Sequence, residues 1–231
     1  MIYDCQSKKV LRFKNKADEF LKAYTTNDLN RPRNAFLDSH GKIIATVDQL
    51  LISPEEVLIV IEAQFEERLR RHLEKYLPLY GTEIKNTDYH IYIDFKSASH
   101  DQNPTYEVST GVLIIVQKAG RMILSSEVLT ATVTEEEFCL FRVQNQISVQ
   151  GVDYDQDVLL NIADEEYVSY NKGCYLGQEI IARIHFKGKP SKKLVVKTDD
   201  ECNAEERSRL TSKIWDPKKS QNFGFLLIQN I

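Results

Sequence analysis

The chain has 231 residues, of which 42% are hydrophobic, and its 34 acidic and 30 basic side chains leave a formal net charge of −4. This composition excludes a chain that is mainly disordered and a nucleic-acid binder driven by bulk positive charge. The longest apolar runs, 57–61 and 112–116, are far shorter than the roughly 20 residues of a membrane-spanning helix. We therefore expect a protein that neither enters a membrane nor binds nucleic acid directly.

The N-terminus and the cysteines indicate the reducing interior of the cell. Residues 1–9 contain no apolar signal-peptide core and no small-residue cleavage site, which predicts a cytoplasmic protein. Cys5, Cys139, Cys174 and Cys202 form no CxxC pair and have no histidines at the spacing of zinc ligands. The sequence thus predicts reduced thiols and no metal site.

The first half of the chain predicts an α+β unit. In chain order we expect a short helix, two strands around a turn, a longer helix that Pro78 ends, and three further strands. Their ranges are 18–23, 43–52, 57–61, 63–76, 89–95, 111–117 and 122–124. This order suits one small antiparallel sheet over residues 43–124, with the longer helix covering one face.

The second half begins with a capped helix. Thr134 is followed by three glutamates, and acids in a first turn interact favourably with the helix dipole, so a helix is expected to begin there. After Phe186 the composition changes, and the lysine-rich residues 187–193 are typical of a linker. Short strands are expected at 194–197, 211–215 and 223–228.

Residues 172–179 read Lys-Gly-Cys-Tyr-Leu-Gly-Gln-Glu and are followed by the apolar start of a helix. The two glycines permit a tight turn or a close approach of the backbone. A thiol just before a helix N-terminus and beside a lysine is expected to have a lowered pKa, which makes Cys174 a candidate reactive thiol. Glu179 lies in the first turn, where its carboxylate is placed to accept hydrogen bonds from a ligand with adjacent N–H groups.

Together with Ala182-Arg183-Ile184-His185, residues 172–179 resemble the signature of the YgfZ-type folate-binding proteins, which are relatives of the glycine cleavage T-protein, an aminomethyltransferase. Weaker similarity extends over 20–29, 36–50, 142–153, 211–212 and Gly224. The resemblance implies an α+β fold in which domains form a ring around a central channel.

The same resemblance implies three domains. Residues 1–42 and 126–185 would form a discontinuous folate-binding domain, and 43–125 an inserted ferredoxin-like α+β domain. Residues 186–231 would form a small C-terminal domain, a reduced form of the family's β-barrel.

In function, the resemblance implies that tetrahydrofolate binds in the channel and that the protein supports assembly or repair of iron–sulfur client proteins, including tRNA-modifying enzymes. T-proteins carry an aspartate that acts on the folate amine, and the matching place here is Ala45-Thr46. Asp48 lies nearby, but strand residues change face at each step, so a slip of two or three residues does not simply restore the geometry. We therefore do not expect a classical aminomethyltransferase.

The resemblance assigns the functional thiol to Cys174 and pterin recognition to Glu179. Arg183 lies one turn beyond Glu179, so it either holds the glutamate tail of folate or forms an ion pair with Glu179. Tyr175 either stacks on the pterin or is a buried aromatic. The remaining folate-binding candidates are Lys172, Gln178, Asn27 and Asp28. For Asn27 and Asp28, the alternative role is to cap the end of a helix.

Three alternative functions stay open at this point. The first alternative is a one-carbon transferase that uses tetrahydrofolate. The second is a binding module that kept the fold and lost the ability to bind folate. A cysteine hydrolase is a weaker alternative, because no histidine and acid are spaced to act with Cys174.

Overall fold

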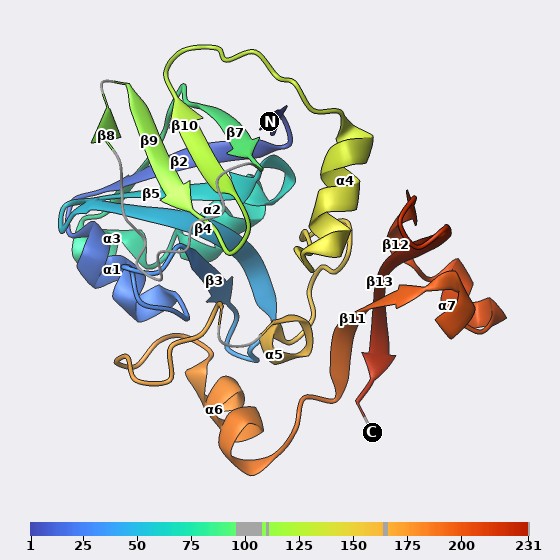
Figure 1. Ribbon diagram of the computed structural model, residues 1–231. Coiled ribbons are helices and arrows are strands. Elements are labelled where there is room, and N and C mark those ends of the chain that lie inside the picture. Colours follow the sequence, from blue (N-terminus) through green and yellow to red (C-terminus); the bar gives the residue numbers. More distant parts are fainter. Residues whose placement is uncertain (96–107, 110, 164–165, 231) are drawn as a thin grey trace.

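The computed structural model describes residues 1–95, 108–109, 111–163 and 166–230, and their strands form three antiparallel sheets (Figure 1). The first sheet has the spatial order β3 (Arg33–Leu37), β4 (Ile43–Ser53), β5 (Glu56–Glu62), β2 (Lys8–Lys14), β6 (Glu83–Asn86). The second has the order β1 (Ile2–Asp4), β7 (His90–Asp94), β10 (Arg121–Ser125), β9 (Val112–Val116), β8 (Val108–Ser109). The third has the order β11 (Lys192–Thr198), β13 (Gln221–Gln229), β12 (Thr211–Asp216).

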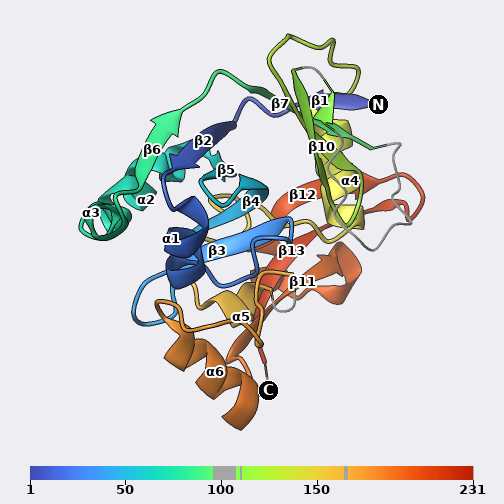
Figure 2. The ribbon, with the colours of Figure 1, turned by 90° about the vertical axis from the view of Figure 1, so that its left-hand side faces the viewer.

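Helices cover the first sheet on one side, and the second sheet packs on the other (Figure 2). The covering helices are α1 (Ala17–Tyr24), α2 (Glu66–Leu73) and α3 (Leu77–Tyr80). The later helices are α4 (Glu135–Gln144), α5 (Leu159–Ile162), α6 (Gln178–Lys187) and α7 (Ala204–Ser208), with short 3-10 turns at Ala63–Phe65 and Asp199–Glu201. Among the described residues, no helix combines the length and the apolar character needed to cross a membrane.

Strand β5 lies at the centre of this packing, and both of its faces are buried. Val57, Ile59 and Ile61 pack against the helices, whereas Leu58 and Val60 pack against the second sheet. Alternate residues of a strand point to opposite faces, so a strand between two layers needs apolar residues at every position. This explains the unbroken apolar run in the sequence.

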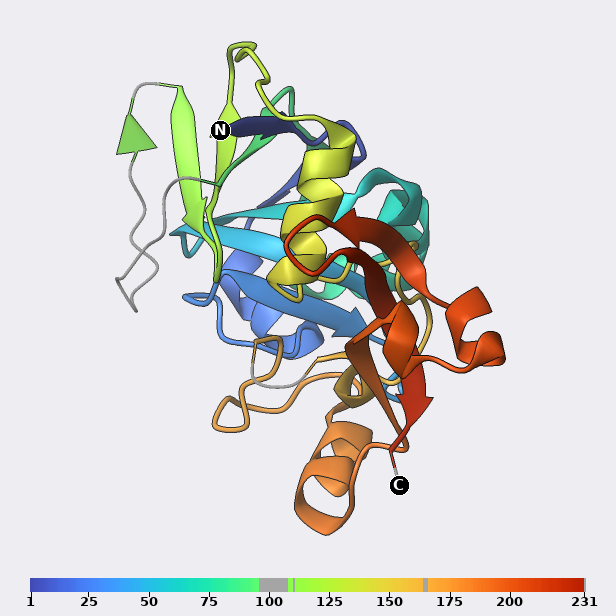
Figure 3. The ribbon, with the colours of Figure 1, turned by 45° about the vertical axis from the view of Figure 1, so that its right-hand side comes forward.

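Helix α4 connects the second and third sheets (Figure 3). It begins as predicted: the Thr134 hydroxyl accepts a hydrogen bond from the Glu137 backbone N–H, and the Glu137 carboxylate accepts one from the Thr134 N–H. Such a capping box satisfies two backbone donors that otherwise have no partner. On one side Phe138 stacks on Tyr3 of β1, and on the other Val143 packs with the aromatic residues of β13.

The single sheet predicted over 43–124 is wrong. Strands β4 and β5 pair with β2 and β3 from the N-terminal segment, while β7, β9 and β10 form the second sheet with β1. The predicted elements include no strand in the N-terminal segment, and pairing with the strands of that segment is what divides the sheet. The strand pairing does not show which parts of the chain fold independently. The domain boundaries at 42 and 125 therefore stay predictions.

The long helix predicted over 63–76 is also divided. A 3-10 turn precedes α2, which ends at Leu73, and Pro78 lies in the first turn of α3 instead of ending a helix. Proline is tolerated there because the first turn has no intrahelical partner for its missing N–H. Further along, the predicted linker shortens to residues 188–191, because α6 continues to Lys187 and β11 begins at Lys192.

Candidate functional site

A cavity lies where the two large sheets separate at one end. On the face of the first sheet that meets the second, Val10, Leu50, Leu58 and Val60 are apolar and buried. Toward one end, the same faces of β2, β4 and β5 turn polar and line the cavity, with residues Lys8, Thr46, Asp48 and Glu62. The register brings these ends together, because Lys8 lies opposite Glu62 across the strand pair.

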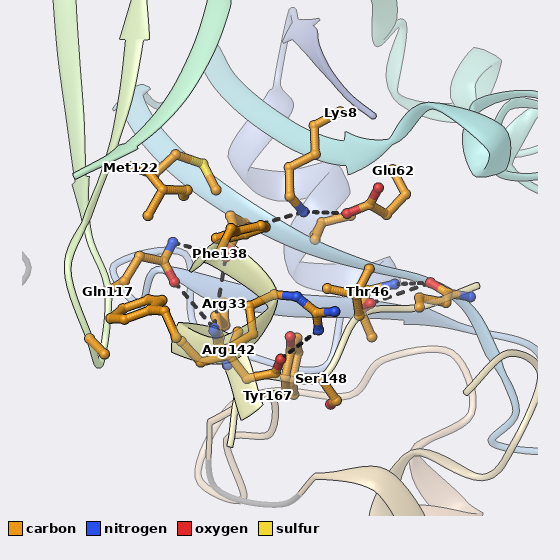
Figure 4. Close-up of a pocket in the computed structure, with 18 residues that line it drawn as sticks. Lys8, Arg33, Thr46, Glu62, Gln117, Met122, Phe138, Arg142, Ser148 and Tyr167 are labelled. Atoms are coloured by element: carbon orange, nitrogen blue, oxygen red, sulfur yellow. Dashed lines mark hydrogen bonds and ion pairs between the residues drawn. The ribbon is translucent and has the colours of Figure 1, made fainter. Parts of the chain in front are cut away.

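Charged groups of both signs meet in this cavity (Figure 4). The Lys8 ammonium lies 2.7 Å from a Glu62 carboxylate oxygen and 4.0 Å from Asp48. Arg33 Nε lies 3.8 Å from the Asp48 carboxylate, which also accepts a hydrogen bond of 3.0 Å from the Gln117 amide. All four charged side chains are at least four-fifths buried. Buried ion pairs contribute little net stability to a fold, so stability alone does not explain four buried charged side chains in one cavity. Because such clusters are typical of functional sites, we treat the cavity as a candidate site.

The opposite wall of the cavity is mostly apolar. It is formed by Ile93 and Met122 of the second sheet, by Phe138 and Phe141 of α4, and by the loop residues 147–150. Arg142 and Tyr167 complete the lining. The cavity volume is about 60 Å³, room for roughly four to six water molecules. An apolar wall facing a few convergent polar groups is typical of small-molecule sites.

A second cavity of about 210 Å³ adjoins the first. Arg33, Ser148 and Tyr167 line both, so these residues lie at the boundary between them. The outer cavity is bounded by α5, by β11 and β13 of the third sheet, and by the charged side chains Lys118, Glu166 and Lys193. The two adjoining cavities lie where the three sheets meet, and we refer to them together as the channel.

The electrostatics keep the cavity bases charged. Burial opposes the positive charge of Lys8, but Glu62 and Asp48 raise its pKa above the ordinary value. Burial likewise opposes the charge of Arg33, whose pKa is raised by the carboxylates of Asp48 and Glu166. Burial raises the pKa of the Tyr167 phenol, which therefore stays protonated. At neutral pH the cavity thus offers hydrogen-bond donors from Lys8, Arg33 and Tyr167.

The motif 172–179 is folded as predicted, as a loop that enters α6. Gly177 takes the position before the helix with φ +85°, and a Cβ there would lie 2.5 Å from the Asp38 carbonyl oxygen. Glycine is therefore required at Gly177. Gly173, by contrast, has open space around it and no left-handed φ, so its expected role in the turn is not seen.

Cys174 is exposed on this loop. The Gln178 amide donates to its sulfur at 3.8 Å, and the Gln178 side-chain oxygen accepts a hydrogen bond of 2.9 Å from the Tyr175 backbone N–H. Gln178 thereby holds the loop closed beside the thiol. The other cysteines differ in exposure: Cys5 and Cys202 are buried and Cys139 is half-buried.

Lys172 does not direct its charge to the thiol. Its ammonium donates to the carbonyl oxygens of Thr25 at 2.6 Å and Asn27 at 2.9 Å, which anchors the loop to the end of α1. Burial lowers the pKa of Lys172 to about 8, with Asp28 acting in the opposite direction. The expected interaction between the Lys172 ammonium and the Cys174 thiol is therefore not formed, because Lys172 binds the backbone after α1 instead.

The remaining predicted residues fall into two groups. Asn27 is buried, and its amide donates to the carbonyl oxygens of Arg33 and Glu166, so it organises the backbone beside the channel. Tyr175 packs against the apolar cluster under α6, and Lys172 lies over its ring. Asp28 is half-buried beside Asn27, and its N–H donates to the Asn27 side-chain oxygen. Glu179 and Arg183 are exposed on α6, and neither forms an ion pair among the described residues.

None of the eight predicted site residues is among the described residues that line either cavity. The cavity residues themselves carried a signal in the sequence, because polar side chains at Thr46 and Asp48 interrupt an otherwise apolar strand on one face. Asp48 does face the cavity, since a displacement of two residues along a strand keeps the same face. The expectation that a displacement along the strand takes Asp48 away from the site is therefore wrong for the two-residue displacement from Thr46.

Comparisons with known proteins agree on the fold. The chain is similar to the glycine cleavage system aminomethyltransferase T from Bartonella henselae, with a TM-score of 0.73 over 99% of this chain and 78% of that one, at 14% sequence identity. The α+β fold expected from the sequence, that of the T-protein, is therefore confirmed. The C-terminal part is an open three-stranded sheet in the described residues.

A shorter similarity concerns the sequence alone. Over 77 residues the chain is 34% identical to a protein of Mycosarcoma maydis described as an "Iron-sulfur cluster assembly factor IBA57 homolog, mitochondrial". The match covers 32% of this chain and 19% of the relative, so the chain spans about a fifth of that relative's length. No protein-family model matches the chain. With the structural likeness, this similarity confirms the resemblance to the YgfZ-type, T-protein-related fold.

Proposed function

We propose that this protein binds a reduced folate in the channel and supports the assembly or repair of iron–sulfur proteins in the cytoplasm. The observation that carries the proposal is the cavity lined by five charged side chains, which lies between the sheets of a T-protein fold. The similarity to an iron–sulfur assembly factor supports the second part. Enzymes that modify tRNA are the client class that the sequence resemblance favours.

The cavity lining suits a pterin ring. A pterin presents N–H donors and ring acceptors along its edges, and Asp48 and Glu62 offer carboxylate oxygens to the donors. Lys8 and Arg33 serve the acceptors, and Phe138 faces the ring from α4. A cavity of about 150 Å³ holds a ring the size of benzene, so the inner cavity of about 60 Å³ must widen toward the adjoining cavity of about 210 Å³ to admit a pterin and the rest of the molecule.

Tetrahydrofolate supplies a carrier for a one-carbon unit when it is bound. The residues of the chain bind and orient it: carboxylates fix the ring edge, and the two sheets with α4 exclude water. Glu179 and Arg183 lie on the outer side of α6, so we assign the folate contacts to the cavity residues in their place.

Cys174 has a separate role in this proposal. Its exposed thiol lies on a loop that Lys172 anchors and Gln178 closes, so it can meet a partner protein or a cluster in transfer without entering the channel. A thiolate is a preferred ligand of iron–sulfur clusters. The cluster is then cargo, to which this chain contributes one sulfur ligand.

Asp48 provides the test of folate binding. The Asp48→Asn protein is expected to bind tetrahydrofolate at least about tenfold more weakly, because a charge-assisted hydrogen bond is worth about 1.5–3 kcal/mol. Isothermal titration calorimetry measures the two dissociation constants. Asp38→Asn, a change outside the channel lining, is the matched control and should bind as the unaltered protein does. Equal affinity of the Asp48→Asn protein would remove Asp48 from the site.

A second candidate function rests on the same residue. Because Asp48 faces the cavity, a carboxylate is available there to act on a bound folate amine, as in a one-carbon transferase. Release of ammonia from an aminomethylated carrier protein, dependent on tetrahydrofolate and lost in Asp48→Asn, would favour this function. No folate binding at millimolar concentration would instead favour a module that has lost its ligand.

A further inference from the structure

Arg33 and Lys118 share one carboxylate at the boundary of the two cavities. Arg33 Nη1 donates to one oxygen of Glu166 at 2.5 Å, and the Lys118 ammonium lies 2.8 Å from the other oxygen. The two bases come from different sheets, since Arg33 belongs to β3 and Lys118 to the turn between β9 and β10. A single carboxylate therefore joins a base of the first sheet to a base of the second at the outer cavity.

The cations outnumber the acids at this point. Lys193 also lines the outer cavity, so three bases line it together with Glu166, the one acid among its described lining residues. Asp48 lies 3.8 Å from Arg33 but faces the inner cavity, where Gln117 and Lys8 also contact it. The positive groups around the outer cavity are thus only partly balanced, and a further carboxylate would be attracted.

Glu166 is placed so that its side chain can leave while its backbone stays. The Asn27 amide donates to the Glu166 carbonyl oxygen at 2.9 Å, and the Thr26 hydroxyl donates to the Tyr167 carbonyl oxygen. These bonds hold the backbone at residues 166 and 167 against the buried turn after α1. Only side-chain rotation is needed to free Arg33 and Lys118 for another carboxylate.

We propose that Arg33 and Lys118 form a binding site for the carboxylate tail of the ligand, and that Glu166 occupies this site in the free protein. The inference deepens the proposed function, on which it rests, by naming the part of the ligand that this boundary recognises. A ligand with a carboxylate tail displaces Glu166, so binding of the tail competes with the chain's own side chain. A ligand that lacks the tail leaves the bridge intact.

Three probes separate the parts of the ligand in calorimetric titrations: p-aminobenzoyl-L-glutamate for the tail, 6-methyltetrahydropterin for the ring, and tetrahydrofolate for both. The Glu166→Gln protein is expected to bind the tail probe and tetrahydrofolate about tenfold more tightly, a change of about 1.4 kcal/mol. It should bind the ring probe unchanged. Lys118→Met should weaken binding of the tail probe and of tetrahydrofolate but not of the ring probe, which provides a second test if Glu166→Gln fails to fold.

Glu67→Gln is the matched control, because Glu67 forms an exposed ion pair with Arg71 on α2, outside both cavities. Equal affinity of Glu166→Gln and the unaltered protein for the tail probe would overturn the inference, as would equal tightening for the ring probe. If the ring probe and tetrahydrofolate bind neither protein while the tail probe binds Glu166→Gln more tightly, the inference stands and folate binding fails.

Discussion

Replacing Asp153 by alanine is expected to lower the free energy of unfolding by about 3–5 kcal/mol, the cost of leaving a buried charge without its partner. One Asp153 oxygen accepts hydrogen bonds from Arg142 Nη1 at 3.0 Å and the Val149 N–H at 2.8 Å. The other accepts from the hydroxyls of Thr211 at 2.9 Å and Ser212 at 2.6 Å. Asp153 thereby joins α4 to the third sheet, with its side chain fully buried.

The measurement is urea unfolding, followed by circular dichroism and by the fluorescence of Trp215, the single tryptophan, which lies on β12, the strand that carries Thr211 and Ser212. Asp155→Ala is the matched control. Asp155 pairs with Arg68 at 2.9 Å, but its side chain is 56% exposed, so a loss of no more than about 1 kcal/mol is expected. Equal stability of the two variants would show that the Asp153 contacts contribute no more than a surface pair.

Replacing Cys174 by serine is expected to abolish the support of iron–sulfur enzymes in cells, down to the level of cells that lack the protein. A serine hydroxyl does not replace a thiolate as a cluster ligand. The side chain is exposed and its described hydrogen bond is to Gln178, so the fold and its stability should not change. The activity of a cluster-dependent client enzyme in cell extracts measures the effect.

Cys139→Ser is the control for this experiment. Cys139 is half-buried, and its thiol donates a hydrogen bond to the Ser212 carbonyl oxygen, so it is not exposed to a partner or a cluster as Cys174 is. It should retain full support of the client enzyme. A stably folded Cys174→Ser protein with full activity would exclude a role for the thiol and would leave folate binding as the function to explain.

Local patterns predicted much of the secondary structure. The hairpin turn at Gly120, the helix cap at Thr134 and the loop of 172–177 before α6 lie where the residues indicated. Each depends on contacts within a few residues, such as a hydroxyl that reaches a backbone N–H or a glycine that adopts a positive φ. The three strands of the third sheet were likewise found from short apolar runs.

The division of the sheets and the position of the cavity could not be predicted in this way. Lys8 and Glu62 are far apart in the sequence and meet only because β2 and β5 pair. Strand partners are chosen by long-range packing, to which local propensity is a weak guide. The glycine and cysteine motif indicates α6 as the site, whereas the charged residues that line the inner cavity come from five separate elements, β2, β3, β4, β5 and α4.

The central claim is that folate binds in the channel, and hydrogen–deuterium exchange with and without tetrahydrofolate tests it most directly. Bound ligand should slow exchange in the loop 145–150 and in the turn 117–120, which border the cavities, and leave 172–184 unchanged. Protection confined to 172–184 would place the ligand on α6 beside Glu179 and contradict the account. Unchanged exchange everywhere at saturating tetrahydrofolate would contradict folate binding itself.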